Sequence, residues 1–151
     1  MNIAASVHVD APKEVIWKII TDVDNWEKNI TAIESIEILE RPDDNFIGLK
    51  WKETRTMFGK KATEIMWITH AEENSFYKTR AESHGAIYIT TISITEKDNG
   101  CDLAFEFNGQ PQSFGAKLMT FLMGWMFVGA TKKAVLKDFT DLKEVAEKAA
   151  G

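Results

Sequence analysis

The fold is decided by the closing stretch, residues 114–150, which reads FGAKLMTFLMGWMFVGATKKAVLKDFTDLKEVAEKAA. This stretch contains no proline, and Ser113 stands before it as a candidate N-cap residue. A continuous helix of this length is about 50 Å long at 1.5 Å per residue. Spaced at 100° per residue, the apolar side chains that share one stripe of the helix are Phe114, Leu118, Phe121, Trp125, Val128, Leu136 and Phe139. We expect this stripe to pack on a sheet.

The sheet comes from the middle of the chain, where polar and apolar side chains alternate with a period of two. The predicted strands are Ile33–Glu40, Phe46–Met57, Ala62–His70, Phe76–Ser83, Ala86–Thr95 and Cys101–Asn108. Turn-forming residues such as Lys97-Asp98-Asn99-Gly100 separate them, so we expect neighbouring strands to pair in order. Leu103, Phe105 and Phe107 alternate with polar residues, which gives the last strand one apolar face for the terminal helix to cover.

The amino-terminal residues predict one more strand and two short helices. Ile3–Asp10 alternates with a period of two, and Pro12 then opens a helix that runs to Ile20. Asp24 and Glu27 have the spacing of a capping box, which indicates a second, shorter helix that carries Trp26.

Three segments resemble motifs of a known superfamily. Asp10-Ala11-Pro12-Lys13-Glu14-Val15-Ile16-Trp17, followed by Asp22 and Trp26, is similar to the amino-terminal signature of the START-like, birch-allergen-like superfamily. Gly48-Leu49-Lys50-Trp51-Lys52-Glu53-Thr54-Arg55 resembles its third-strand pattern. Residues 134–143, which read AVLKDFTDLK, resemble its last helix. Within the superfamily, the chain is most similar to the polyketide cyclase/dehydrase and lipid transport branch.

The resemblance extends over essentially the whole chain and implies an α+β helix-grip fold. Residues 1–151 would form a single ligand-binding domain. A curved antiparallel sheet of about seven strands would surround the long carboxy-terminal helix, with the two short helices placed after the first strand. An apolar cavity would lie between sheet and helix. Members of this superfamily include enzymes, carriers and regulators, so the fold alone does not decide the function.

Composition excludes several classes of function. The 151 residues carry 18 Lys and Arg against 23 Asp and Glu, a net charge of −5, which argues against nucleic acid as a partner. The longest apolar run, Leu118–Ala130, is shorter than the ~20 residues of a transmembrane helix, so we expect no transmembrane segment. The first residues lack the pattern of a secretory signal, and Cys101 is the single cysteine. We therefore expect a cytoplasmic protein.

The strong motifs for cofactors and metals are missing from the sequence. It contains no Gly-rich phosphate loop, no CxxC pair and no HExxH helix, so we expect neither a cofactor nor a metal. His8, His70 and His84 are far apart, which favours solvated or locally bonded side chains over catalytic ones. Cys101 has no identifiable base beside it and is interpreted as structural.

A few charged residues fall where apolar ones are expected. Glu53 and Arg55 share a strand face with Trp51, so they either pair with each other, bind a polar group of a ligand, or lie at a wet rim. The face of Glu64 stays open, because the pattern around it does not fix which residues of that strand point inward. Lys132 falls in line with Trp125 on the inner stripe of the helix, where its ammonium either meets a ligand carboxylate or extends to water.

Aromatic residues gather where the implied cavity lies, which leads to our first hypothesis: a carrier or sensor of a small hydrophobic or lipid-like molecule. A filled core is the alternative for such residues. The predicted ligand-binding residues are Trp26, Trp51, Arg55, Glu64, Met66, Tyr88, Thr90, Phe105, Phe107, Phe121 and Trp125. The competing hypothesis is an enzyme that performs cyclisation, dehydration or hydrolysis in the cavity, with Glu53, Arg55, Glu64 or His70 as acid, base or electrophile.

A third hypothesis concerns the other side of the long helix, where Met119, Met123, Met126 and Phe127 form an apolar face. A curved sheet that holds the helix on both sides would bury this face. Otherwise the face serves a homodimer or another protein partner, or it contacts a membrane surface transiently.

Overall fold

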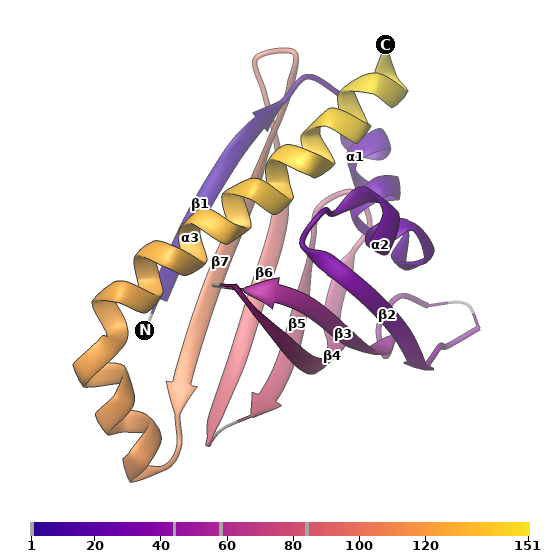
Figure 1. The fold of residues 1–151 in the computed structure, drawn as a ribbon. Coiled ribbons are helices and arrows are strands. Elements are labelled where there is room, and N and C mark those ends of the chain that lie inside the picture. The colour runs from indigo at the N-terminus through magenta and orange to yellow at the C-terminus, as the bar shows by residue number, and fades with distance from the viewer. Residues whose placement is uncertain (1, 44, 58, 84) are drawn as a thin grey trace.

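The computed structural model describes residues 2–43, 45–57, 59–83 and 85–151, and the side chains of residues 57, 116 and 118–127 lie outside this description. The elements follow the order predicted from the sequence (Figure 1). They are β1 (Asn2–Val9), α1 (Lys13–Ile20), the 3-10 helix η1 (Val23–Asn25), α2 (Trp26–Asn29), β2 (Ile33–Glu40), β3 (Lys50–Met57), β4 (Lys60–Glu72), β5 (Phe76–Ser83), β6 (Ala86–Lys97), β7 (Gly100–Pro111) and α3 (Phe114–Ala150).

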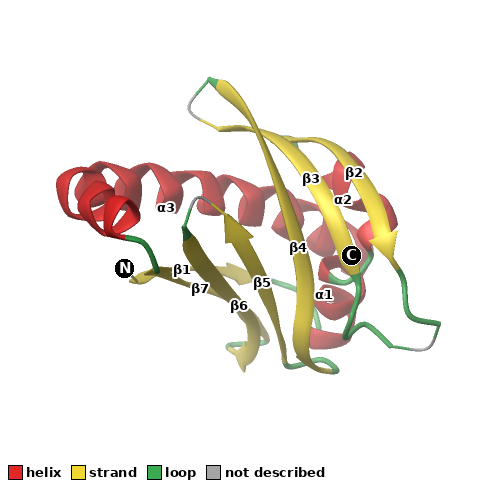
Figure 2. Cartoon of the chain, turned by 90° about the horizontal axis from the view of Figure 1, so that it is seen from below, coloured by secondary structure: helices red, strands yellow, loops and turns green. Residues whose placement is uncertain are grey.

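The strands form one curved antiparallel sheet of seven strands in the order β1-β7-β6-β5-β4-β3-β2, and α3 lies along its concave side (Figures 1 and 2). Consecutive strands from β2 to β7 pair in order, as predicted. Links of two or three residues join them from β3 onward, whereas β2 and β3 are joined by residues 41–49. Asp98 and Asn99 join β6 to β7 with φ values of 50° and 66°, the geometry of a two-residue hairpin turn. This helix-grip arrangement confirms the predicted fold class.

Three local predictions are wrong. The strand expected from Phe46 begins only at Lys50, because Gly48 takes a φ of 95° and the Leu49 amide donates to the Phe46 carbonyl in a turn. The capping box is absent: Asp24 does not cap η1 or α2 but forms an ion pair with Arg41. Phe114 is 82% exposed, since it occupies the first position of α3, far from the half of the helix that packs on the sheet.

The core lies where the carboxy-terminal half of α3 and helix α1 meet the concave face. Phe139 is buried as predicted and packs edge-on against Phe105 of β7, with ring centroids 6.2 Å apart. Ile16, Val9, Ile68, Leu103 and Cys101 are the largest fully buried side chains. Val128 and Leu136 of the predicted stripe are half-buried, and Leu118, Phe121 and Trp125 belong to the stretch whose side chains are not described.

Candidate functional site

The strand register decides which residues face α3. Trp51 lies opposite Met66, Met66 opposite Ala81, and Ala81 opposite Tyr88. The next pairs across the sheet are Thr90 with Phe107 and Phe107 with Ile3. Directly opposite residues of antiparallel strands project to the same face. The structure therefore brings together on the concave face the predicted residues Trp51, Arg55, Glu64, Met66, Tyr88, Thr90, Phe105 and Phe107.

The end of this face near α1 and α2 is closed by packed aromatic side chains. Trp26, 5% exposed, meets Trp51 edge-on at 5.1 Å and donates its indole N–H to the Ile20 carbonyl at 3.1 Å. The Tyr77 hydroxyl donates to the same carbonyl at 3.4 Å. Burial, with a smaller contribution from the charge of Glu53, raises the pKa of Tyr77. Trp26 and Trp51 thus form the wall of a closed end.

The opposite end, near the start of α3, is less covered. Glu64, Met66, Tyr88, Thr90 and Phe107 point to the concave side but are only half-buried. The rings of Tyr88 and Phe107 stack at 5.5 Å with an interplanar angle of 21°. Phe105 continues the stack at 6.2 Å from Phe107. These side chains form an aromatic cluster beside polar groups.

A charged group connects β3 to α3 across the concave side. Arg55 donates from Nε to Glu53 at 2.8 Å and from Nη1 to Asp138 at 2.9 Å, while the Trp51 indole N–H lies 3.4 Å from Glu53. Burial lowers the pKa of Arg55, but the two carboxylates outweigh it and the pKa lies above its ordinary value. Of the three alternatives for Glu53 and Arg55, their mutual pairing is what the structure has.

Asp138 is the residue of this group that sequence reasoning missed. Burial raises its pKa, and the guanidinium of Arg55 only partly opposes that effect. Its Oδ1 atom is buried and has no hydrogen-bond partner among the described residues. The sequence did contain a signal for Asp138. This residue directly precedes Phe139, which lies on the stripe of the helix that faces the sheet, and a carboxylate buried there needs a partner on the sheet.

Glu64 forms a second polar group with the end of β5. Ser83 donates its hydroxyl to Glu64 at 2.8 Å. Burial raises the pKa of Tyr88, and the negative charge of Glu64 adds to this effect. The carboxylate, the serine and the tyrosine therefore face the same part of the concave side.

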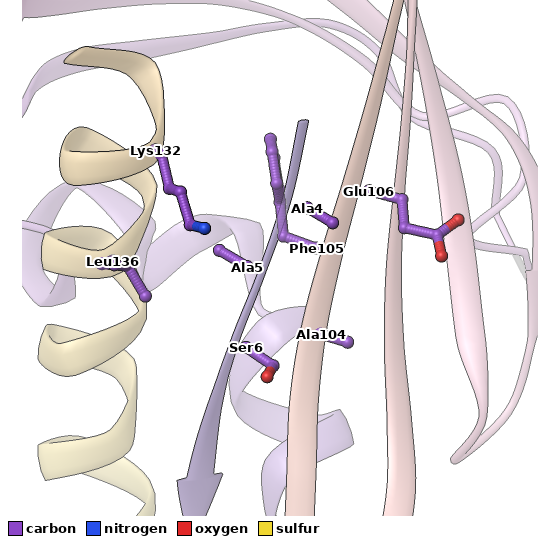
Figure 3. Close-up of a pocket in the computed structure, with 8 residues that line it drawn as sticks. All are labelled: Ala4, Ala5, Ser6, Ala104, Phe105, Glu106, Lys132 and Leu136. Carbon is purple, nitrogen blue, oxygen red and sulfur yellow. The ribbon is translucent and has the colours of Figure 1, made fainter. Parts of the chain in front are cut away.

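Lys132 lies apart from these polar groups, at a hollow beside β1. An open hollow of about 480 Å³ is lined by Ala4, Ala5, Ser6, Ala104, Phe105, Glu106, Lys132 and Leu136. Figure 3 shows Lys132 and Leu136 on α3 turned toward Ala5 of β1, with Ser6 and Ala104 pointing to the other side of the strand pair. Lys132 is exposed, so its ammonium is in contact with water at the edge of the sheet.

The remaining candidates lie outside this site. His70 is exposed and its register partner is Lys78, on the convex face, and His8 pairs with Asp102 and Asp10. Cys101 is 1% exposed, and burial raises the pKa of its thiol, as a structural cysteine requires. Within the described part of the chain no group of His, Cys, Asp or Glu has the arrangement of a metal site.

Some predicted residues cannot be placed. His84 falls outside the described residues, as do the side chains of Phe121, Trp125, Met119, Met123, Met126 and Phe127. The hypothesis about the methionine face of α3 therefore stays a prediction. None of the helices, as far as they are described, is long and apolar enough to cross a membrane.

Comparison with known proteins gives a family and a fold. A family model described as polyketide cyclase / dehydrase and lipid transport matches residues 1–147. The search of curated proteins finds no match.

Three solved structures are similar over nearly their whole length. A protein of Thermus thermophilus has 14% identity and a TM-score of 0.82, with 100% of both chains covered. The Zhui aromatase/cyclase of Streptomyces sp. R1128 has 15% identity and a TM-score of 0.77, with 98% of this chain and 94% of that chain covered. A START superfamily protein of Mycobacterium smegmatis has 16% identity and a TM-score of 0.66, with 99% and 96% covered. At these identities, the likeness shows the fold.

Proposed function

This chain belongs to the polyketide cyclase / dehydrase and lipid transport family, and we propose that it binds a small, largely apolar molecule on the concave face of its sheet, beneath α3. The observation that carries the proposal is the uneven covering of that face. Ile68, Leu103 and Cys101 at the α1 end are at most 1% exposed. Tyr88 and Phe107 face the same side at the other end and are only half-buried. A ligand at that end would cover apolar surface that the chain leaves in contact with solvent.

The chemistry of the open end fits such a ligand. Tyr88, Phe107 and Phe105 form a continuous aromatic surface, on which a flat ring or a chain of methylene groups gains area and stacking. Thr90, Glu64 and the Tyr88 hydroxyl stand beside this surface and supply a few polar contacts. Binding sites for small molecules combine these two features, a mostly apolar lining and a small number of polar groups.

Titration with phenylnaphthylamine, a neutral probe whose fluorescence rises in apolar surroundings, tests the proposal. We expect saturable binding at one site, and Tyr88→Ala to weaken it by about tenfold, since losing the aromatic contact removes about 1.4 kcal/mol. Ile89→Ala is the matched control, because Ile89 follows Tyr88 on β6 and points to the convex face. Absence of binding, or equal loss in both variants, would contradict the proposal.

One observation favours a second candidate, chemistry on the bound molecule. Glu64 is half-buried beside Ser83 and Tyr88 and forms no ion pair among the described residues, unlike Glu53. A carboxylate in that position suits proton transfer in a cyclisation or dehydration. Mass spectrometry of the small molecules extracted from wild-type and Glu64→Gln protein separates the two functions. A carrier yields the same molecules from both proteins, whereas a dehydrating enzyme leaves in the variant a species heavier by one water.

A further inference from the structure

The hollow between β1 and α3 combines an apolar lining with a cation. Its volume of about 480 Å³ lies in the range of sites for small molecules, ~300–1,000 Å³. Ala5 of β1 and Phe105 of β7 are directly opposite each other, so both project to the side of the sheet that α3 covers. Lys132 and Leu136, four residues apart on α3, are turned toward Ala5 (Figure 3). An ammonium group therefore stands beside the apolar surface of Ala5, Phe105 and Leu136.

Lys132 differs from the lysines that pair along α3. Lys137 and Lys143 each form an ion pair with a carboxylate four residues later, those of Asp141 and Glu147. The residue four positions after Lys132 is Leu136, so the helix offers it no such partner. Within the described part of the chain Lys132 forms no ion pair. Its charge is available to an anion that enters the hollow.

The first part of α3 carries only positive charge. Residues 114–137 contain no Asp or Glu and four lysines, which are Lys117, Lys132, Lys133 and Lys137. Lys117 and Lys133 are exposed like Lys132, so all of them favour an anion near this part of the helix. Lys132 is the one among the four that lines the hollow. The hollow therefore selects the place along the helix where an anion with an apolar part is held.

The acidic residue in the lining of the hollow, Glu106, is directed elsewhere. It lies opposite Ala4 of β1 and Thr91 of β6, on the convex side of the sheet. Figure 3 shows its carboxylate turned away from α3 and from Lys132. Because Glu106 is also exposed, solvent screens its charge. A carboxylate beside Lys132 is therefore matched by the ammonium without being repelled at close range.

We propose that this hollow is a second binding site, which takes a carboxylate on a short alkyl chain, such as octanoate. The carboxylate pairs with Lys132, and the alkyl chain lies over Ala5, Leu136 and Phe105. The ion pair contributes no more than about fivefold to the affinity, because Lys132 is exposed, and apolar contact supplies the rest. The hollow lies at the β1 edge of the sheet, two strands away from Tyr88 of β6, so this inference does not depend on the proposed function.

Titration of isotope-labelled protein with sodium octanoate at physiological ionic strength, followed by amide NMR, tests the inference. We expect shifts concentrated at the amides that border the hollow, those of residues 4–6, 104–106 and 132–136. Octanamide has the same shape without the charge, and it should shift the same amides but bind about three- to fivefold more weakly. Absence of octanoate binding, or shifts concentrated around Tyr88 instead, would overturn the inference.

Two lysine variants locate the charge. Lys132→Gln should weaken octanoate binding about three- to fivefold and leave octanamide binding unchanged. Lys133→Gln is the matched control, because it removes the same charge from the next position, about 100° around the helix, and should leave the ratio of the two affinities unchanged. An equal loss of octanoate affinity in both variants would show that the charge of the whole helix holds the anion, and would refute the inference.

Two alanine variants locate the alkyl chain. The larger side chain of Ala5→Leu enters the hollow, so octanoate and octanamide should both lose their shifts there. Ala4→Leu projects to the convex face and should leave both titrations unchanged. The amide spectrum reports whether each variant is folded. Unchanged octanoate binding in Ala5→Leu would overturn the inference, whereas failure of phenylnaphthylamine to bind would remove only the proposed function at Tyr88.

Discussion

The Thr131 hydroxyl is buried on α3 without a hydrogen-bond partner in the described part of the chain. A buried hydroxyl in this state costs about 1–3 kcal/mol. Valine has the same shape without the polar atom. We therefore expect Thr131→Val to raise the free energy of unfolding by about 1 kcal/mol, as measured by urea denaturation of protein from which bound small molecules have been extracted.

Thr140 provides the comparison for this substitution. It lies on the same helix, is exposed, and its hydroxyl donates to the Leu136 carbonyl at 2.7 Å. Thr140→Val should change the unfolding free energy by no more than about 0.5 kcal/mol. If Thr131→Val destabilises the protein, then the Thr131 hydroxyl is hydrogen-bonded in solution without a ligand, contrary to this expectation.

Individual residues also show which contacts can be predicted from the sequence and which cannot. Residues two apart on a strand project to the same side, which places Glu53 and Arg55 on one face. The sequence leaves open whether they pair, bind a ligand or lie at a wet rim, and the structure shows the pair. Asp138 was missed, because the helical period gives the face of a residue but not the strand that it meets. Only the register and the helix placement together bring Asp138 within 2.9 Å of Arg55.

At the scale of elements, Asp141 fixes α3 to the loop between α2 and β2. Its carboxylate accepts hydrogen bonds from the Thr31 amide at 2.9 Å and from Lys137. Burial tends to raise the pKa of Asp141, but these two donors outweigh it and hold the pKa below its ordinary value of 3.8. The stabilising contribution is therefore complete above that ordinary value, and is lost as the pH falls through the lowered pKa of the folded state.

We accordingly expect Asp141→Asn to lower the free energy of unfolding by about 1 kcal/mol at neutral pH, and Asp141→Ala by about 2 kcal/mol, since alanine also leaves the Thr31 amide unpaired. Denaturation curves across the acid range should show the Asp141→Asn deficit shrink toward zero below the ordinary carboxyl pKa. Asp43→Asn, at an exposed position, serves as the control. A deficit that is the same at acid and neutral pH would show that charge has no part in the contact.

The boundaries of helices and strands were predicted well where the hydrophobic pattern was periodic. They were predicted poorly where a single backbone angle determined where the element begins. The limits of α3 were predicted correctly from the absence of proline and a long apolar stripe. The start of β3 was not, because Phe46 and Leu49 fit a strand pattern but Gly48 adopts a left-handed φ of 95° between them. The sequence did not decide which face Glu64 lies on, because alternation within one strand has two possible phases. The strand register decides it by placing Glu64 opposite Glu53.

At the scale of the whole molecule, the concave face has a closed end that stabilises the fold and a less covered end where we propose that a ligand binds. Ile16 of α1 and Leu103 of β7 are each 1% exposed at the closed end, and their burial contributes to folding regardless of any ligand. Tyr88 and Phe107 at the other end are half-buried, so they contribute less to folding and remain available to a ligand. Substitutions at the two ends should therefore act on different equilibria.

This separation gives a quantitative expectation. Phenylnaphthylamine at 100 times its dissociation constant should add about 2.7 kcal/mol to the unfolding free energy of the wild-type protein. Ile16→Val should lower stability by about 1 kcal/mol yet keep that increment, because the binding end is untouched. Tyr88→Ala, with tenfold weaker binding at the same probe concentration, should retain an increment of only about 1.4 kcal/mol. Denaturation with and without the probe measures all three increments.

A reduced increment in Ile16→Val would mean that the two ends are coupled, and packing near α1 would then have to be counted as part of the binding site.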